Sequence, residues 1–325
     1  MKIFLYLLSL GLLITPAYTL EHTSKVVLNS ISKKKCLTKK ELISKIKKNE
    51  DVRSLNVSCI KDLSRLFYEN TTFNQDISNW DVSNVTNMES MFAGAEKFNQ
   101  PLNQWDVSHV INMSYMFAGA EKFNQPLNQW DTSHVVNMEG LFSMAISFNQ
   151  ELGKWDVSHV TNMKRLFDDS EVFDQSLNKW DVSHVVNMEK LFRHAEHFNQ
   201  PLNHWDVSHV VNMAEMFSGA MSFNQPLNHW DVSHVKFMQW MLSAEEFNQP
   251  LKRWDVSNVI YIQNMFAGAK TFNQNIQDWN ISHVIRYENF NRKSALEDKF
   301  LPSFEDMSLI KSKYPIHFES SIHKD

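Results

Sequence analysis

One pattern of hydrophobic and polar positions returns every 25 residues along most of the chain. From Trp80 to Trp230 the tryptophans are 25 residues apart, Trp254 follows after 24, and Trp279 after 25. The repeat reads F-N-Q-P-L-N-x-W-D-V-S-H-V-x-N-M-x-x-M-F-x-G-A-x-x, and a degenerate unit around Leu55 precedes it. A fixed period of this length predicts a solenoid, because stacked coils bury a core that no single coil could bury.

Each repeat carries two hydrophobic periodicities. Trp105 and Val107 alternate with polar residues, which predicts a short strand. Apolar residues from Met113 to Ala120 then follow the i, i+3, i+4, i+7 spacing of a helical stripe. The sequence therefore predicts an α/β repeat, a leucine-rich-repeat-like solenoid of about ten coils that each contain a strand and a short helix.

The two ends depart from the repeat and divide the chain into four parts. Residues 1–19 combine a lysine, an apolar run and a small-residue cleavage site, which is typical of a signal peptide. Residues 20–54 contain a Thr-x-x-Glu capping-box pattern and predict an N-terminal capping helix region. The solenoid is expected over residues 55–295, with a C-terminal cap and tail over residues 296–325.

Two cysteines, Cys36 and Cys59, lie beyond the predicted signal peptide. An even pair in an exported protein favours a disulfide, which here would tie the capping helix to the first coil. A metal site built from two cysteines is the weaker alternative.

Charge and composition narrow the classes of function. The formal net charge of −5 argues against a nucleic-acid partner, which would require a basic surface. Neither a GxxxxGK[ST] nor a GxGxxG motif occurs, so no nucleotide cofactor is expected. The N-terminal apolar run is short and no second one follows, so the mature chain is expected to contain no membrane span.

The motif F-N-Q-x-L-x-x-W-D-V-S-x-V-x-N-M-x-x-M-F resembles the bacterial surface-protein repeats of the BspA-like leucine-rich-repeat group. The resemblance covers residues 55–295 and implies a right-handed solenoid, at the cell surface or secreted. It also implies adhesion or host-protein binding, the roles proposed for some relatives, without indicating a ligand. Relatives of this kind share a scaffold more firmly than they share a function.

The repeated polar residues include the Asp-x-Ser-His motif, of which Asp106, Ser108 and His109 form one copy. These are the residue types of a nucleophilic triad, but a triad is assembled once, whereas this motif recurs in successive coils. We therefore interpret it as architecture and expect no enzyme. The aspartates at this position in successive coils would form a column, which we call the Asp column. It is expected to order turns, and a strip of bound cations along it is the alternative. The histidines of successive coils would form a second column, for which zinc binding and pH sensitivity both stay open. The repeated asparagines predict ladders of amide hydrogen bonds that stabilise the fold.

Binding residues are expected where the repeat is broken. Phe237 replaces the usual Asn, Trp240 stands three positions later, and Tyr261 occupies the Asn position of the next coil. With Lys236 beside them, these rings predict an exposed patch for a protein or glycan. The alternative is that these rings turn inward and fill space created by the one-residue deletion before Phe247.

A second candidate surface is the variable position just before each tryptophan, on the expected concave, strand-side face. This position changes from neutral amides to cations along the chain. Its cationic or titratable members are Lys154, Lys179, His204, His229 and Arg253.

Together these patterns predict an exported protein, at the cell surface or secreted, that acts by binding a protein or glycan. The alternative is a non-adhesive scaffold in the periplasm or envelope. A defined envelope partner would favour that alternative.

Overall fold

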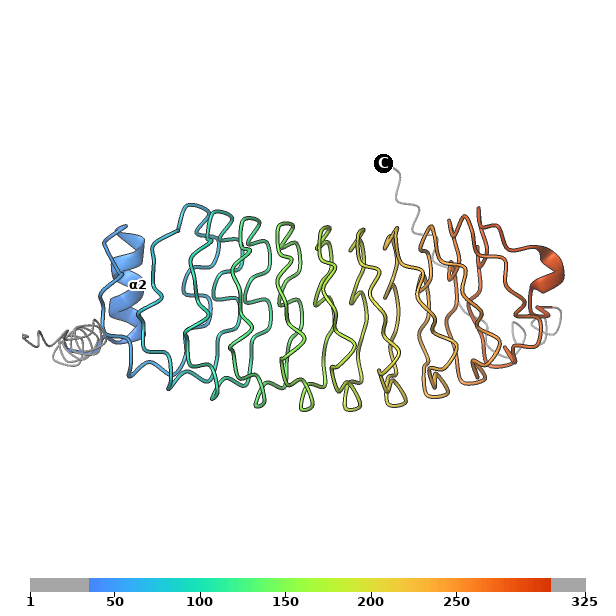
Figure 1. The fold of residues 1–325 in the computed structure, drawn as a ribbon, viewed down its shortest axis with the longest axis horizontal. Coiled ribbons are helices and arrows are strands. Elements are labelled where there is room, and N and C mark those ends of the chain that lie inside the picture. The colour runs from blue at the N-terminus through green and yellow to red at the C-terminus, as the bar shows by residue number, and fades with distance from the viewer. Residues whose placement is uncertain (1–34, 305–325) are drawn as a thin grey trace, which may run out of the picture.

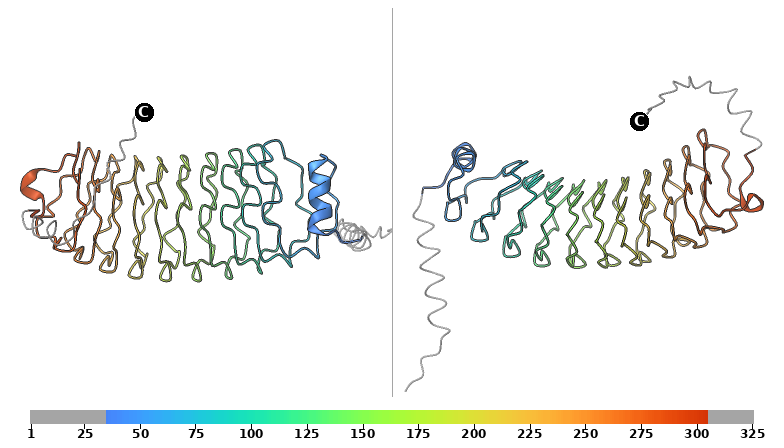
Figure 2. Two further views of the ribbon diagram at one scale, coloured as in Figure 1. Left: turned by 180° about the vertical axis from the view of Figure 1, so that it is seen from behind. Right: turned by 90° about the horizontal axis from the view of Figure 1, so that it is seen from above.

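The computed structural model describes residues 35–304 as one row of stacked coils (Figure 1). The row begins with a helix, α2 (Lys39–Lys47), and ends beyond the coils with a short 3-10 helix, η1 (Asp298–Phe300). The row bends gently along its length (Figure 2). The predicted signal peptide, residues 1–19, lies outside the described residues.

The coils contain neither the strand nor the short helix that the repeat pattern predicted. In the described residues, α2 and η1 are the two helices, and pairing between coils consists of isolated parallel bridges. Each bridge joins one coil to the next at the position that carries Asn in most repeats. The bridged residues, in order, are Asp62, Asn87, Asn112, Asn137, Asn162, Asn187, Asn212, Phe237, Tyr261 and Arg286.

The segment expected to be helical is a series of tight turns. The Met116 N–H donates to the Met113 carbonyl at 3.1 Å, which closes a turn. Tyr115 and Gly119 have φ angles of 56° and 65°, which a right-handed helix does not allow. The Met113 N–H donates to the Asn137 carbonyl of the next coil at 3.1 Å. Backbone groups that a helix would pair internally are therefore paired between coils.

These turns nevertheless place the repeated apolar residues inside. Met113, Met116, Phe117 and Ala120 are all fully buried. Turns closed by a hydrogen bond between residues three apart bury the same positions, i, i+3, i+4 and i+7, as an amphipathic helix would. The apolar spacing thus identified the buried face but not the local conformation. The right-handed, leucine-rich-repeat-like class of the stack stays a prediction.

Two columns of phenylalanine run through the core. Within one coil, Phe92 and Phe98 stack with ring centroids 4.1 Å apart, and Phe92 stacks on Phe117 of the next coil at 5.5 Å. Burial of each ring contributes roughly 2–3 kcal/mol. Leu242 occupies the Phe117-type position in the coil with the one-residue deletion and interrupts that column.

The predicted strand around Trp105 is replaced by turns, although Trp105 and Val107 are both buried. The indole N–H of Trp105 donates to the Ile77 carbonyl of the preceding coil at 3.2 Å. Trp130 donates in the same way to the Leu102 carbonyl at 2.9 Å. The tryptophan column therefore fixes neighbouring coils to each other and fills the core.

The N-terminal helix is capped and fixed to the first coil. Thr38 Oγ1 accepts the Glu41 N–H at 3.2 Å, and the Glu41 carboxylate accepts the Thr38 N–H at 2.8 Å. Leu42 is fully buried in the core that the coils share. The predicted disulfide between Cys36 and Cys59 is confirmed.

The last coil is covered by the chain that follows it. The Ile276 N–H donates to the Phe300 carbonyl at 3.1 Å, and the Tyr287 and Phe304 rings stack at 4.9 Å. Among the described residues, neither helix is long and apolar enough to cross a membrane.

Candidate functional site

The Asp-x-Ser-His motif forms a turn rather than a triad. Asp106 Oδ1 accepts the Ser108 N–H at 3.1 Å and the Ser108 hydroxyl at 2.6 Å. Ser108 Oγ lies 3.4 Å from His109 Nδ1. In a triad the imidazole lies between the carboxylate and the hydroxyl, so that it can take the hydroxyl proton. Here the hydroxyl lies in the middle and donates to the carboxylate.

The same bonds keep the Asp column charged. In seven of these turns, the Ser hydroxyl, followed by the Ser backbone N–H, lowers the pKa of the Asp carboxyl, as expected when hydrogen bonds favour the ionised form. For Asp106, the neighbouring Asp131 acts in the opposite direction and raises the pKa without reversing the shift. The carboxyls with a lowered pKa are Asp106, Asp131, Asp156, Asp181, Asp206, Asp231 and Asp255.

The cation and zinc alternatives gain no support from this arrangement. Within residues 35–304, no three His, Cys, Asp or Glu side chains come together as a possible metal-binding group. His283 Nδ1 lies 2.6 Å from the Ser257 carbonyl oxygen of the preceding coil. Asn258, at the equivalent position, donates to the Ser233 carbonyl at 2.8 Å. At these two coils the position therefore serves a contact between coils, whereas His109 contacts the serine of its own coil.

A continuous amide ladder runs along the coils. Asn99 Oδ1 accepts the Asn124 N–H at 3.0 Å and the Gln125 side-chain amide at 3.0 Å. The same pair of bonds recurs at successive coils, with Asp174 replacing one Asn. The ladder acceptors are Asn74, Asn99, Asn124, Asn149, Asp174, Asn199, Asn224 and Asn248. Repeated Asp and Ser side chains thus order turns within each coil, and repeated Asn, Gln and Trp side chains hold neighbouring coils together. The breaks in the repeat remain as candidate sites.

The first break is the aromatic cluster, defined as Phe237, Trp240 and Tyr261. The Phe237 and Tyr261 rings contact each other with centroids 5.5 Å apart, and both are half-buried. Trp240 is 39% exposed but forms no ring contact with the other two in the described structure. The three residues therefore do not pack into the core. Lys236 is exposed beside them, and the Arg286 guanidinium lies 5.8 Å from the centre of the Tyr261 ring.

This cluster lacks hydrogen bonds that other coils make. Asn212 Oδ1 accepts the Ala214 N–H at 3.0 Å, a bond that the Phe237 and Tyr261 side chains do not make to the equivalent N–H groups in the described structure. The buried amide oxygens of Gln239 and Gln263 have no hydrogen-bond partner among the described residues. The aromatic cluster therefore replaces residues that would stabilise the fold, a departure that is typical of functional sites.

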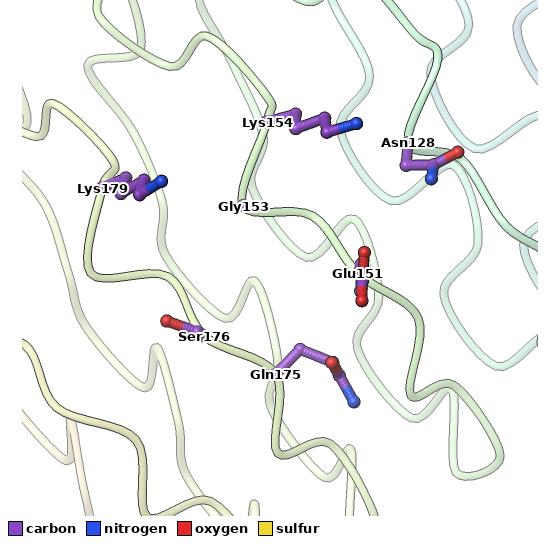
Figure 3. Close-up of a pocket in the computed structure, with 7 residues that line it drawn as sticks. All are labelled: Asn128, Glu151, Gly153, Lys154, Gln175, Ser176 and Lys179. Atoms are coloured by element: carbon purple, nitrogen blue, oxygen red, sulfur yellow. The ribbon is translucent and has the colours of Figure 1, made fainter.

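The second break is a hollow of about 280 Å³, which we call the lysine pocket (Figure 3). Two predicted cationic residues, Lys154 and Lys179, line it from neighbouring coils. The other members of that series, His204, His229 and Arg253, do not line this pocket. The complete lining is Asn128, Glu151, Gly153, Lys154, Gln175, Ser176 and Lys179.

Gly153 accounts for the hollow. Five coils carry Asn at this position, and Asn103 Oδ1 accepts the Gln129 N–H of the next coil at 3.0 Å. Asn178 makes the same bond to the His204 N–H at 3.0 Å. Gly153 has no side chain, so the equivalent acceptor is missing for Lys179. Sequence reasoning identified the two lysines but missed the glycine, whose signal was the G in F-N-Q-E-L-G-K-W.

A charged cluster on the bridge side of the coils was also missed. Asp168 is 1% exposed, and Arg193 from the next coil donates to its two carboxylate oxygens at 2.6 and 3.1 Å. Burial raises the pKa of Asp168 against the opposing effect of Arg193. His194 Nδ1 also lies 2.7 Å from Asp169. Since its charges pair with one another, this cluster stabilises the stack rather than offering a free site.

Stacked 25-residue coils with non-repeated residues on the outside define a repeat protein rather than a fold built around one deep cleft. The chain matches a family described as a Mycoplasma protein of unknown function, DUF285, over residues 38–152, 123–220 and 200–303. These overlapping segments include the coils, so the chain belongs to this repeat family. No curated protein and no solved structure matches it.

Proposed function

We propose that the chain is an exported, non-enzymatic binding protein of the BspA-like surface type. Its right-handed, leucine-rich-repeat-like stack would present the aromatic cluster to a protein or glycan. The proposal rests chiefly on one observation: the repeated polar residues bond to one another, whereas the aromatic cluster breaks the repeat and leaves aromatic surface exposed. Aromatic residues of this kind dominate the energetics of many interfaces.

The exposure of the Trp240 ring supports this proposal. The φ angle of Trp240 is 57°, in the left-handed region, where Asn264 and Asn289 stand in the next two coils. Asn tolerates this region, whereas a bulky side chain there costs roughly 1 kcal/mol or more. The same positive φ occurs at the equivalent Tyr115 and Lys190, so the angle belongs to the scaffold, and the exposed ring is the feature that favours ligand contact.

Binding by the aromatic cluster can be tested by substituting its residues with those found at the equivalent positions of other coils. The purified chain is screened on glycan and host-protein arrays, beside a triple variant that carries Phe237→Asn, Trp240→Asn and Tyr261→Asn. We expect the triple variant to fold and to lose at least tenfold in affinity, as typical for loss of interface anchors. The control is Tyr68→Ala, which removes a ring that is 40% exposed and installs the residue found at Ala93.

Retained affinity in the triple variant, or an equal loss in the Tyr68→Ala control, would contradict binding through the aromatic cluster. Either result would favour the alternative of a structural scaffold without a surface ligand.

Surface exposure needs its own test, because a scaffold inside the envelope would have the same fold. Intact cells are treated with protease, and the full-length chain is followed beside a known protein from inside the envelope. We expect the chain to be degraded while the control protein survives. Survival of both until the cells are opened would contradict surface display and favour cross-linking to envelope partners as the next experiment.

A further inference from the structure

We infer that the lysine pocket binds an anionic saccharide, with Lys154 and Lys179 on its negative group and the other polar side chains on its hydroxyls. The pocket lies on a different segment of the coil from the aromatic cluster. It is therefore a second site, and it requires only that the folded chain be accessible to a sugar.

The two lysines have charges that the protein does not neutralise. Elsewhere, lysines reach carboxylates one coil away: Lys164 lies 3.2 Å from Glu189, and Lys190 lies 3.3 Å from Glu215. No carboxylate among the described residues forms such a pair with Lys154 or Lys179. The two positions are one coil apart, roughly 4.8 Å for stacked chains, so their charges repel. A bound anion would remove that repulsion.

The neighbouring coils show what these lysines replace. At the same position, Gln104 donates its side-chain amide to Gln129 across the coil junction at 2.8 Å. Lys154 and Lys179 cannot make this bond, because both are donors only. A neutral bond between coils has thus been exchanged for two cations facing one hollow.

The backbone adds a third donor. In three other coils, the backbone N–H of the residue just before the tryptophan donates to the Asn of the preceding coil. Gly153 removes that acceptor, and the Lys179 N–H has no partner among the described residues. An added Cβ at Gly153 would lie 3.2 Å from the carbonyl oxygen of Ser176, which lines the hollow, so a side chain there would crowd this wall. Gly153 therefore removes both an acceptor for this donor and the side chain that would narrow the hollow.

The remaining lining favours a sugar over an acidic peptide. Figure 3 shows Lys154 extended toward Asn128, with Gln175 and Ser176 bordering the hollow from the next coil. Amide and hydroxyl groups donate to and accept from sugar hydroxyls. The carboxylate of Glu151 also accepts hydrogen bonds from hydroxyls but repels a ligand with many negative charges. A saccharide with one carboxylate or sulfate satisfies all these groups.

The test is a ligand-observed NMR titration of the purified chain with D-glucuronate, D-glucose 6-sulfate, D-glucose and tetraglutamate. We expect one or both anionic sugars to bind, and the response to the two shows whether the pocket takes a carboxylate or a sulfate. Neutral glucose and tetraglutamate are expected to bind at least about tenfold more weakly. No binding of either anionic sugar, or tighter binding of tetraglutamate, would overturn the inference.

Two variants separate the charges from the hollow. Lys154→Gln with Lys179→Gln installs the side chains found at Gln104 and Gln129, and should weaken the anionic sugar at least about tenfold. Gly153→Asn keeps both lysines but fills the pocket with the residue that five other coils carry, and should also abolish binding. Unchanged affinity in either variant would overturn the proposed site.

A matched control removes the same charge elsewhere. Lys97 and Lys122 are also exposed and one coil apart, so Lys97→Gln with Lys122→Gln changes the net charge equally. This control should bind the anionic sugar as the unaltered chain does. An equal loss in the control would show attraction by overall charge and would overturn the pocket. The aromatic cluster is intact in all these variants, so their failure leaves the proposed function standing.

Discussion

Replacement of Asn124 by alanine removes one acceptor from the amide ladder. Asn124 Oδ1 accepts the Asn149 N–H at 3.0 Å and the Gln150 side-chain amide at 2.9 Å. Each neutral hydrogen bond contributes about 0.5–1.5 kcal/mol net. Because Asn124 is exposed and water can reach its partners, we expect the free energy of unfolding to fall by about 1–2 kcal/mol.

The assay is urea unfolding followed by tryptophan fluorescence and by circular dichroism. The two signals are compared, because a repeat array can unfold in more than one step. The matched control is Asn124→Asp, which keeps the acceptor oxygen. Asp174 already makes this pair of bonds in the natural chain, at 3.0 and 2.9 Å. At neutral pH, Asn124→Asp should unfold close to the unaltered chain.

Two results would refute this reasoning. An Asn124→Ala chain as stable as the unaltered one would show that the ladder contributes nothing. An Asn124→Asp chain as unstable as Asn124→Ala would show that the acceptor oxygen is not the stabilising group.

Three further changes test other parts of the structure. Replacing Cys36 and Cys59 by serine should lower the free energy of unfolding by roughly 3 kcal/mol, measured by urea unfolding, and reductant should then have no further effect. Trp155→Phe leaves the Leu127 carbonyl without its 2.9 Å donor and should cost about 2–3 kcal/mol by the same assay. Ser158 holds the pKa of Asp156 below its ordinary 3.8. The ionised Asp156 carboxylate therefore stabilises the fold fully above pH 3.8, and this contribution is lost as the pH falls through the lower pKa of the folded state. Acid unfolding should therefore depend less steeply on pH in Asp156→Asn; an unchanged slope would contradict this.

The sequence predicted the period, the buried positions and the disulfide, but not the local backbone. Met113, Met116 and Phe117 have the spacing of a helical stripe and are buried. The helix is absent because Tyr115 and Gly119 adopt positive φ angles and the backbone bonds to the next coil. A helix and a stack of turns bury the same residues, so apolar spacing alone cannot distinguish them.

The sequence predicted a candidate site where a conspicuous residue replaces the usual one, and missed the part of a site that depends on a small residue. Phe237 and Trp240 stand out because aromatic rings replace the usual residues, although only Phe237 and Tyr261 are in ring contact. The lysine pocket was harder to predict, because Lys154 and Lys179 define a pocket only once Gly153 is known to leave a hollow beside them. Missing side chains create space that sequence patterns do not show.

The central claim is that the repeated residues build the scaffold and that the breaks in the repeat bind ligands. It is tested most directly by measuring ligand binding and urea unfolding of one regularised chain. This chain carries Asn at positions 153, 237, 240 and 261, and Gln at positions 154 and 179. We predict that it unfolds at the same or a higher urea concentration than the natural chain and no longer binds its protein, glycan or anionic sugar. Binding that persists in a folded regularised chain would contradict the claim.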